Sequence, residues 1–348
     1  MYRKEKNKRT EISELGEFGL IKHLSENIEI YNKSTIKGIG DDAAVISCGT
    51  DEILVSTDIL TEGVHFDLAY TPLKHLGYKA AAVNISDIAA MNGVAEQITV
   101  SIALSNRVSL EAIDEIYEGI KLACKKYQVD FVGGDTSASA AGLFISITVI
   151  GRAKKESITY RSGAGVNDIV LVSGDLGAAY MGLLLLEREK MVYKSNPDMQ
   201  PELTGYDYIL QRILKPEPRT DIVKRLKEAG VVPTSMIDIS DGLASDIIHI
   251  CQESGKGCAL YEEKFPIHPL TISMGEEFKI NAVTAALSGG EDYELLFTVS
   301  PKDFEKLKNI SGITPIGHIT ESGINIITRN GGTIPVKAQG WDAFLKNK

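Results

Sequence analysis

The stretch KGIGDDAAVISCGTDEILVSTDILTEGVHF, residues 37–66, decides how the chain can be organised, because it carries acids at both ends of a compact apolar unit. Its two apolar runs, Ala43–Ser47 and Ile53–Ser56, are separated by a short polar turn, and this pattern predicts a β-hairpin. Since a hairpin brings its open ends together, Asp42 and Asp58 are expected to be neighbours in space.

Two neighbouring carboxylates need a partner. At a separation of about 4 Å they repel each other by roughly 1 kcal/mol in bulk water and by roughly 4 kcal/mol at a protein-like dielectric constant. Hard divalent cations prefer carboxylate and carbonyl oxygen, and Mg²⁺ usually binds together with substrate phosphates. The hairpin therefore predicts a site for Mg²⁺ and phosphate; the alternative is a pair of solvated acidic turns.

Composition narrows the class of protein. The 348 residues suggest two domains or one large one, and 43% apolar with 24% charged residues is typical of a soluble globular chain. The net charge of −10 argues against a basic face for nucleic acid. No apolar run reaches membrane-spanning length. The four cysteines, Cys48, Cys124, Cys251 and Cys258, form no CxxC pair, which predicts a reduced, cytoplasmic protein without a thiolate metal site.

The chain divides at a charged, glycine-containing stretch. Residues 1–12 are a basic tail without the apolar core of a signal peptide. The best boundary lies in Gly151–Asn167, so the two expected domains are residues 13–151 and 152–348. Periodicity predicts helices over Ser13–Ser25, Pro72–Gly93, Ser109–Tyr127, Ala178–Glu187, Arg219–Ala229 and Leu243–Gln252, and strands over Ile98–Leu104, Asp130–Thr136, Leu143–Ile150, Asp168–Ser173, Met236–Asp238 and Tyr293–Val299.

Further acids stand at positions that favour a ligand role. Asp87 interrupts an almost wholly apolar helix, where an unpaired buried carboxylate is costly, so a metal ligand is favoured over a solvated stripe. Asp135 follows two glycines that would let the backbone approach a ligand. Asp238 ends an apolar strand and has no capping role. Asp241 is either a helix cap or a ligand, and Ser240 can do either job.

Several other residues are candidates, and most of them keep two interpretations. His65 lies just past the acidic strand and is either structural or a substrate contact. Arg161 is either a phosphate clamp or a surface arginine. Tyr117 belongs to the core by helical spacing alone. Trp341, the single tryptophan, could cap a core or stack on a flat ring. No GxxxxGK[ST] motif occurs, so a bound ATP would not use a P-loop.

Seven motifs together resemble the thiamine-monophosphate kinase family, which shares its superfamily with aminoimidazole ribonucleotide synthetase. They stand in the family's order over about residues 14–345: GIGDDAAV, STDILTEGVHF, KAAAVNISDIAAMNG, VGGDTS, RSGA, DISDGL and LSGGEDYEL. The basic N-terminal extension and the ending Trp-Asp-Ala-Phe depart from the family pattern, which leaves the detail of ring stacking open.

The resemblance implies an α/β (α+β) fold of two synthetase-like domains, each a mixed sheet covered by helices. It implies a homodimer joined through the N-terminal domains, which would also bind ATP and Mg²⁺, and phosphorylation of thiamine monophosphate to thiamine diphosphate. Several Mg²⁺ ions would be held by Asp42, Ser56, Thr57, Asp58, Asp87, Asp135, Asp238 and Asp241. ATP would contact Tyr117, Gly134, Asp135, Arg161 and Ser240, and thiamine monophosphate would contact His65, Glu291 and Trp341.

Direct in-line transfer without a protein nucleophile is the expected mechanism, because the acceptor is already a phosphate and the protein has only to position two polyanions and offset their charge. The oxygen-only ligand set also predicts tolerance of Mn²⁺. One rival is another ATP-dependent synthetase of the superfamily; a selenophosphate synthetase would carry a reactive cysteine near a glycine-rich N-terminus, whereas Cys48 lies inside the hairpin. The other is a non-catalytic protein that binds Mg²⁺ and nucleotide.

Overall fold

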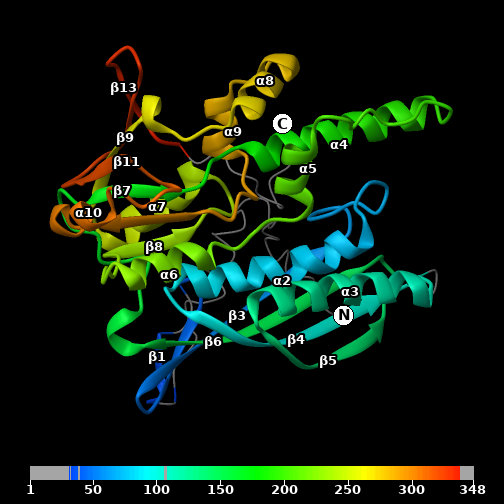
Figure 1. The fold of residues 1–348 in the computed structure, drawn as a ribbon, viewed down its shortest axis with the longest axis horizontal. Coiled ribbons are helices and arrows are strands. Elements are labelled where there is room, and N and C mark those ends of the chain that lie inside the picture. Colours follow the sequence, from blue (N-terminus) through cyan, green and yellow to red (C-terminus); the bar gives the residue numbers. More distant parts are fainter. Residues whose placement is uncertain (1–30, 32, 38–39, 106–107, 338–348) are drawn as a thin grey trace, which may run out of the picture.

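The chain builds two mixed β-sheets with helices packed against them, which confirms the predicted fold class. The computed structural model describes residues 31, 33–37, 40–105 and 108–337 (Figure 1). The predicted tail at residues 1–12, the predicted helix Ser13–Ser25 and Trp341 lie outside the described residues.

The first sheet has six strands in the order β1-β2-β3-β6-β4-β5, antiparallel except for the β4–β5 pair. The predicted hairpin is confirmed, with Cys48 opposite Asp51 at its turn. The second strand of the hairpin runs further than its apolar segment, so Asp58 lies inside a strand and not at its end. The strands are β1 (Thr35–Lys37), β2 (Ala44–Cys48), β3 (Asp51–Thr61), β4 (Val94–Leu104), β5 (Asp130–Ala138) and β6 (Phe144–Lys154).

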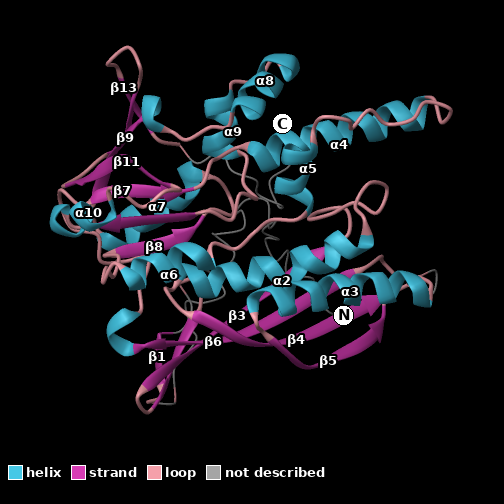
Figure 2. Cartoon of the chain, viewed as in Figure 1, coloured by secondary structure: helices cyan, strands magenta, loops and turns pink. Residues whose placement is uncertain are grey.

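Two helices cover one face of this sheet, α2 (Leu73–Ala90) and α3 (Leu110–Tyr127) (Figure 2). The amphipathic helix α3 is capped by Ser109, whose hydroxyl accepts a hydrogen bond from the Ala112 amide, and its apolar side faces inward. Helix α2 is buried on nearly all sides, because it contacts β3 and β6 of the first sheet and also β8, α5 and α6 of the second unit. Its small side chains allow this close packing, and it becomes the element shared by both halves.

The second sheet has seven strands in the order β13-β12-β9-β11-β7-β10-β8, antiparallel except for β9 and β12. Its strands are β7 (Ile169–Ser173), β8 (Ser235–Asp238), β9 (Gly257–Tyr261), β10 (Leu295–Val299), β11 (Ile313–Thr320), β12 (Ile324–Ile327) and β13 (Thr333–Pro335). The helices of this half are α4 (Ala178–Ser195), α5 (Asp207–Leu214), α6 (Thr220–Glu228), α7 (Leu243–Ser254), α8 (Pro269–Phe278), α9 (Ala282–Ser288) and α10 (Pro301–Leu307), with short 3-10 turns at Lys155–Ser157 and Glu262–Lys264.

The expected boundary at residues 151/152 falls within strand β6. Strand β6 continues to Lys154, and Arg152 still pairs with Ile53 of β3 and Val94 of β4. The chain passes from the first sheet to the second between Lys154 and Ile169, inside the glycine-containing stretch but later than expected. Within the described residues, no helix combines the length and apolar character needed to cross a bilayer.

Candidate active site

Three carboxylates from distant parts of the chain converge between the two sheets. Asp42 precedes β2, Asp87 lies in the last turn of α2, and Asp238 is the final residue of β8. One oxygen from each lies within 4.8 Å of the others, which is a spacing that could hold a metal ion. These three acids, which were predicted to share one site, therefore lie together, and helix α2 is the element that brings the two halves of the chain together there.

Hydroxyl and amide groups orient the acids. Ser56 donates a hydrogen bond to Asp87 (Oγ–Oδ2, 2.6 Å), and Ser86 donates one to Asp238 (Oγ–Oδ2, 2.5 Å). The side chain of Asn84 accepts from the backbone amide of Asp58 at 3.1 Å. The polar positions of α2 thus fix β3 on one side and β8 on the other, which explains why polar residues interrupt an apolar helix.

The carboxylates sit where their charge is unfavourable. Burial, with repulsion from Glu291 and Asp42, raises the pKa of Asp58 to about 6. Burial and the nearby Asp42 raise the pKa of Asp238 to about 7, and burial with Asp58 raises the pKa of Asp87 well above its ordinary value. Without a cation this site would take up protons near neutral pH, so it is built to receive positive charge.

Arg161 supplies part of that charge. Its guanidinium donates two hydrogen bonds to Asp42, Nε–Oδ2 and Nη2–Oδ1, both 3.0 Å long. Its backbone amide donates to Asp41 at 3.0 Å. The interpretation of Arg161 as an isolated surface arginine is wrong, because the side chain faces the acids and is ion-paired there.

Asp246 is a site carboxylate that the sequence reasoning missed. It lies in the first turn of α7, is 1% exposed, and its Oδ2 is buried without a hydrogen-bond partner among the described residues. Burial, with repulsion from Asp241 and Asp238, raises its pKa well above the ordinary value. Its place five residues after Asp241, in a helix that starts at the DISDGL motif, was the available signal.

A second group of residues adjoins Asp58. His65 accepts a hydrogen bond from the Thr61 amide at Nδ1 (3.0 Å), and burial lowers its pKa, so the neutral ring directs Nε2–H away from that bond. Lys79 of α2 forms an ion pair with Glu291 and donates to the His65 carbonyl at 3.3 Å. His65 and Glu291, both predicted substrate contacts, are thus joined by a lysine that the sequence reasoning left unassigned.

The turn that carries Glu291 has an unusual backbone. Glu291 and Tyr293 adopt φ values of 63° and 50°, a region that non-glycine residues rarely occupy. The amide of Glu291 donates to the Ser240 carbonyl (2.7 Å) and that of Tyr293 to the Ile239 carbonyl (2.8 Å). A Cβ on Gly290 would lie 2.5 Å from the Ser240 carbonyl, so the GGED segment needs glycine there to pack onto the DISDG segment.

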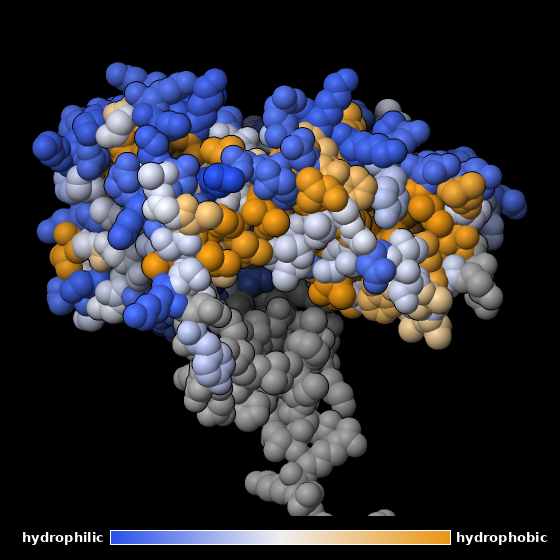
Figure 3. All heavy atoms as spheres, turned by 90° about the horizontal axis from the view of Figure 1, so that it is seen from below, coloured by the Kyte–Doolittle hydropathy of each residue, from blue (hydrophilic) through white to orange (hydrophobic). Residues whose placement is uncertain are grey.

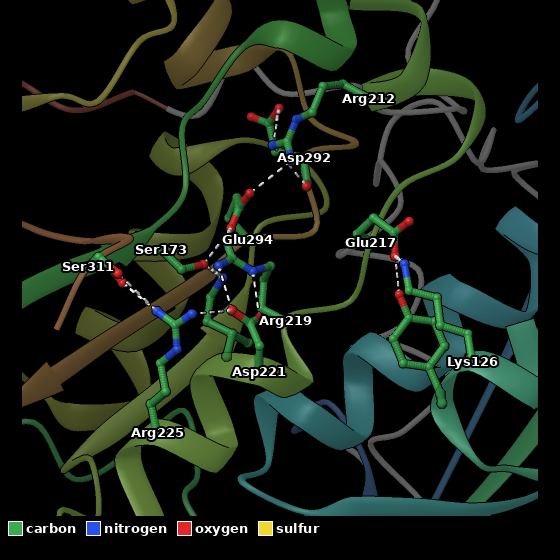
Figure 4. A network of polar contacts seen from close by, with 12 residues as sticks. Lys126, Ser173, Arg212, Glu217, Arg219, Asp221, Arg225, Asp292, Glu294 and Ser311 are labelled. Carbon is green, nitrogen blue, oxygen red and sulfur yellow. Dashed lines mark hydrogen bonds and ion pairs between the residues drawn. The ribbon is translucent and has the colours of Figure 1, made fainter. Parts of the chain in front are cut away.

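A buried ion-pair network anchors the far end of this turn (Figure 4). Glu294 pairs with Arg212 of α5 and with Arg219, and it accepts a hydrogen bond from Ser173. Asp292 accepts from the amide of Gly177 at the start of α4, and its backbone carbonyl accepts from Arg212. Strained backbone persists only where its surroundings hold it, and this network supplies that support.

Four residues that were predicted to bind metal or ATP lie on elements other than those that carry the acidic trio or make different contacts there. Asp135 and Gly134 lie on β5, which is exposed along its whole length, and Tyr117 packs against Phe131 of the same strand at 5.9 Å between ring centroids. A Cβ on Gly134 would lie 1.9 Å from the Val100 carbonyl, so strand packing explains this glycine. Thr57 lies between Ser56 and Asp58 on β3, where successive side chains alternate between the two faces of the sheet. Its hydroxyl forms hydrogen bonds with the Thr148 hydroxyl and the Ile147 carbonyl of β6.

Ser240 accepts a hydrogen bond from the Glu291 amide, and the backbone of Asp241 lies against Gly290. The helix cap is Gly242, without a side-chain cap hydrogen bond, so the interpretation of Asp241 as the N-cap is wrong. The donor set as a whole consists of carboxylate and hydroxyl oxygens, which is the chemistry that Mg²⁺ prefers. Buried acids with raised pKa values and the unpartnered oxygen of Asp246 are what such a site would show before a cation binds. The residues therefore fit divalent metal ions.

Comparison with known proteins first identifies the class of the N-terminal half of the chain. Residues 40–153 match the family model described as AIR synthase related protein, N-terminal domain. The match covers most of the first sheet with helices α2 and α3, so this half of the chain is a domain of the AIR synthase related class.

The relatives narrow the class to a family. The chain is 38% identical to the thiamine-monophosphate kinase of Bacillus subtilis over 88% of this chain and 92% of that protein. It is 35% identical to the Aquifex aeolicus enzyme over 96% and 99%. A solved structure described as "AaThiL complexed with AMPPCP and TMP" matches with a TM-score of 0.82 at 32% identity, covering 96% of this chain and 99% of that one. The chain belongs to the thiamine-monophosphate kinase family.

Proposed function

We propose that this protein transfers the γ-phosphoryl group of ATP to the phosphate of thiamine monophosphate and releases thiamine diphosphate and ADP. The observation that carries the proposal is the convergence of Asp42, Asp87 and Asp238, with oxygens within 4.8 Å, beside His65 and Glu291. The solved relative with an ATP analogue and TMP supports both substrates.

The carboxylates would hold Mg²⁺, which when bound offsets the charge of two phosphate groups and orients them in line. In this proposal Asp42, Asp58, Asp87 and Asp238 supply oxygen ligands, with Ser56 and Asp241 beside them. Arg161 faces the ATP phosphates, since guanidinium pairs bidentately with phosphate oxygen as well as with carboxylate. His65 and Glu291 face thiamine monophosphate.

No protein nucleophile is needed, because the acceptor phosphate attacks directly. Tyr117, Gly134 and Asp135 lie together on α3 and β5, and we assign the nucleotide to that edge of the first sheet. The roles of Thr57 and Trp341 stay predictions from the resemblance. A cytoplasmic location accords with this substrate pair and with the four cysteines, none of which forms a disulfide within the described residues.

We further propose a homodimer formed through the first sheet. The face of this sheet opposite α2 and α3 carries Ile59, which is 55% exposed, and Val132 of the edge strand β5 is 57% exposed. Figure 3 shows several apolar patches among polar side chains on the described part of this side of the molecule. An exposed edge strand beside an apolar face is a ready surface for a second copy. Sedimentation equilibrium tests it: a dimer is expected, and Ile59→Lys should shift the equilibrium toward monomer.

An ADP-release assay with and without thiamine monophosphate tests the activity. ADP release that requires both thiamine monophosphate and a divalent cation is the expected result. Release with another acceptor instead would support a different synthetase of the superfamily, and binding of nucleotide without any turnover would support the non-catalytic alternative.

A further inference from the structure

We propose that Lys79 is a further substrate-binding residue: its ammonium group binds the acceptor phosphate while Glu291 faces the cationic ring of the same molecule. The proposal rests on the proposed function and deepens it. Lys79 and Glu291 then act as a preformed pair of opposite charges for a substrate that itself carries a positive ring and a negative phosphate.

The geometry places the lysine at the acceptor end of the site. The Lys79 side chain is 5% exposed, pairs with Glu291, and donates to the carbonyl of His65 at 3.3 Å. Glu291 in turn lies close enough to Asp58 to raise the pKa of that carboxyl. Lys79 therefore contacts both predicted substrate-binding residues, and its partner Glu291 lies close to Asp58, a neighbour of the acidic trio.

Charge complementarity explains why the pair is there. The site is dominated by carboxylates, so a phosphate dianion approaching it needs a cation near its landing point. Arg161 is already ion-paired with Asp42, whereas Lys79 is ion-paired with Glu291. Without a ligand, Lys79 and Glu291 neutralise each other; with a dipolar ligand, each can face the opposite charge of that ligand, so no buried charge is left alone.

Stability alone does not account for the arrangement. An ion pair between the buried Lys79 and the half-buried Glu291 contributes little net stability, because removing the charges from water offsets much of their attraction. Glu291 also adopts a φ of 63°, which is a strained conformation for a glutamate. Two unfavourable features at one contact point indicate that the contact serves recognition.

Equilibrium binding of three ligands separates this role from a structural one. Titration calorimetry of the full chain with Mg²⁺ compares thiamine monophosphate, thiamine, which lacks the phosphate, and AMPPCP. Lys79→Met should weaken the binding of thiamine monophosphate about tenfold to a hundredfold, which is the effect of losing a charge-assisted hydrogen bond. The affinities for thiamine and AMPPCP should be unchanged. Lys74→Met is the matched control, since Lys74 lies on the same helix but pairs with Glu118 at the surface.

A second variant guards against misfolding. Lys79→Met combined with Glu291→Gln leaves no unpaired buried charge, and it should fold while binding thiamine monophosphate no better than thiamine. The assignment of Lys79 would be overturned if the affinities for all three ligands fell equally. It would also be overturned if either variant kept the unmodified protein's preference for thiamine monophosphate over thiamine. Turnover of thiamine monophosphate by the unmodified protein is measured separately, so a failure of the proposed function is distinguished from a failure of this inference.

Discussion

The guanidinium of Arg161 donates two parallel hydrogen bonds to the carboxylate of Asp42, each 3.0 Å long, across the junction of the two halves of the chain. Asp42 belongs to the acidic trio, and Arg161 lies in the segment that crosses from the first sheet to the second. A cation that binds the trio and an arginine that binds Asp42 compete for one carboxylate. Filling the site should therefore release Arg161 toward the phosphate groups of ATP.

Replacing Arg161 should affect the KM values for the two substrates differently. Arg161→Lys keeps the charge but loses the planar fork, so we expect the KM for ATP to rise about tenfold or more while the KM for thiamine monophosphate changes little. Steady-state kinetics with each substrate varied in turn provide the measurement. Arg152→Lys, an exposed arginine paired with Glu96, is the control. An equal rise in both KM values would count against the assignment of Arg161 to ATP.

Asp58→Asn should lower activity and raise the stability of the metal-free protein together. Loss of a metal-directed carboxylate removes several kcal/mol of transition-state stabilisation, so we expect kcat/KM to fall about a hundredfold or more. Since burial and Glu291 raise the pKa of Asp58 to about 6, the neutral amide removes a buried charge at pH 8.

Urea unfolding at pH 8 without metal measures the second effect, and Asp198→Asn at an exposed position is the control. A variant that kept near-normal turnover would refute the assignment of Asp58. One that lost stability would show that its carboxylate has a favourable partner in the metal-free protein.

The acidic cluster should make stability depend on pH. Asp58 and Asp238 have folded-state pKa values raised to about 6 and about 7, above the ordinary value of 3.8, and Asp87 is raised well above it. Groups with raised values contribute stability that is fully present below about pH 4 and is lost as the pH rises through 6 to 7. Metal-free protein should therefore lose this contribution between about pH 4 and 7.

A divalent cation should reverse that loss. Because protons and Mg²⁺ compete for the same carboxylates, Mg²⁺ should raise the Tm more at pH 8 than at pH 5.5. Thermal unfolding with EDTA and with Mg²⁺ at the two pH values is the measurement. A Tm increase of the same size at both pH values would contradict a cation held by these acids.

Two adjacent glycines of β5 should respond differently to a methyl group. A Cβ at Gly134 would lie 1.9 Å from the Val100 carbonyl, whereas at Gly133 it meets nothing within 4 Å. Gly134→Ala should cost about 1–3 kcal/mol of unfolding free energy, and Gly133→Ala should cost much less. Urea denaturation of the pair is the test. Equal effects would mean that the β4–β5 contact is not as close as the structure has it.

Local sequence pattern predicted much of the fold. The alternating runs around Gly49 predicted the β2–β3 hairpin, and helical spacing predicted α2 and α3 to within a few residues. The pattern could not show that β3 continues through Asp58, because its second half mixes acids with apolar residues. It also could not show that β5 is exposed throughout, since Phe131 and Val132 look like core residues in sequence.

The site was harder to predict than the elements. Asp87 and Asp238 are far apart along the chain, and only the packing of α2 against β8 brings them together, so the seven motifs and not their spacing pointed to a shared site. Lys79 was missed because it lies in a run of small apolar residues that reads as core, and its partner Glu291 comes from the other half of the chain. Gly134 was predicted to contact ATP, and its close approach to the Val100 carbonyl is a second reason for glycine there, which the sequence could not show.

Anomalous diffraction at the manganese edge tests the central claim most directly. Crystals grown with Mn²⁺ and AMPPCP should show manganese peaks bounded by the carboxylates of Asp42, Asp87 and Asp238, and these peaks should be lost from crystals of the Asp87→Asn variant. Manganese bound only at other surfaces, with these three carboxylates left bare, would contradict the account.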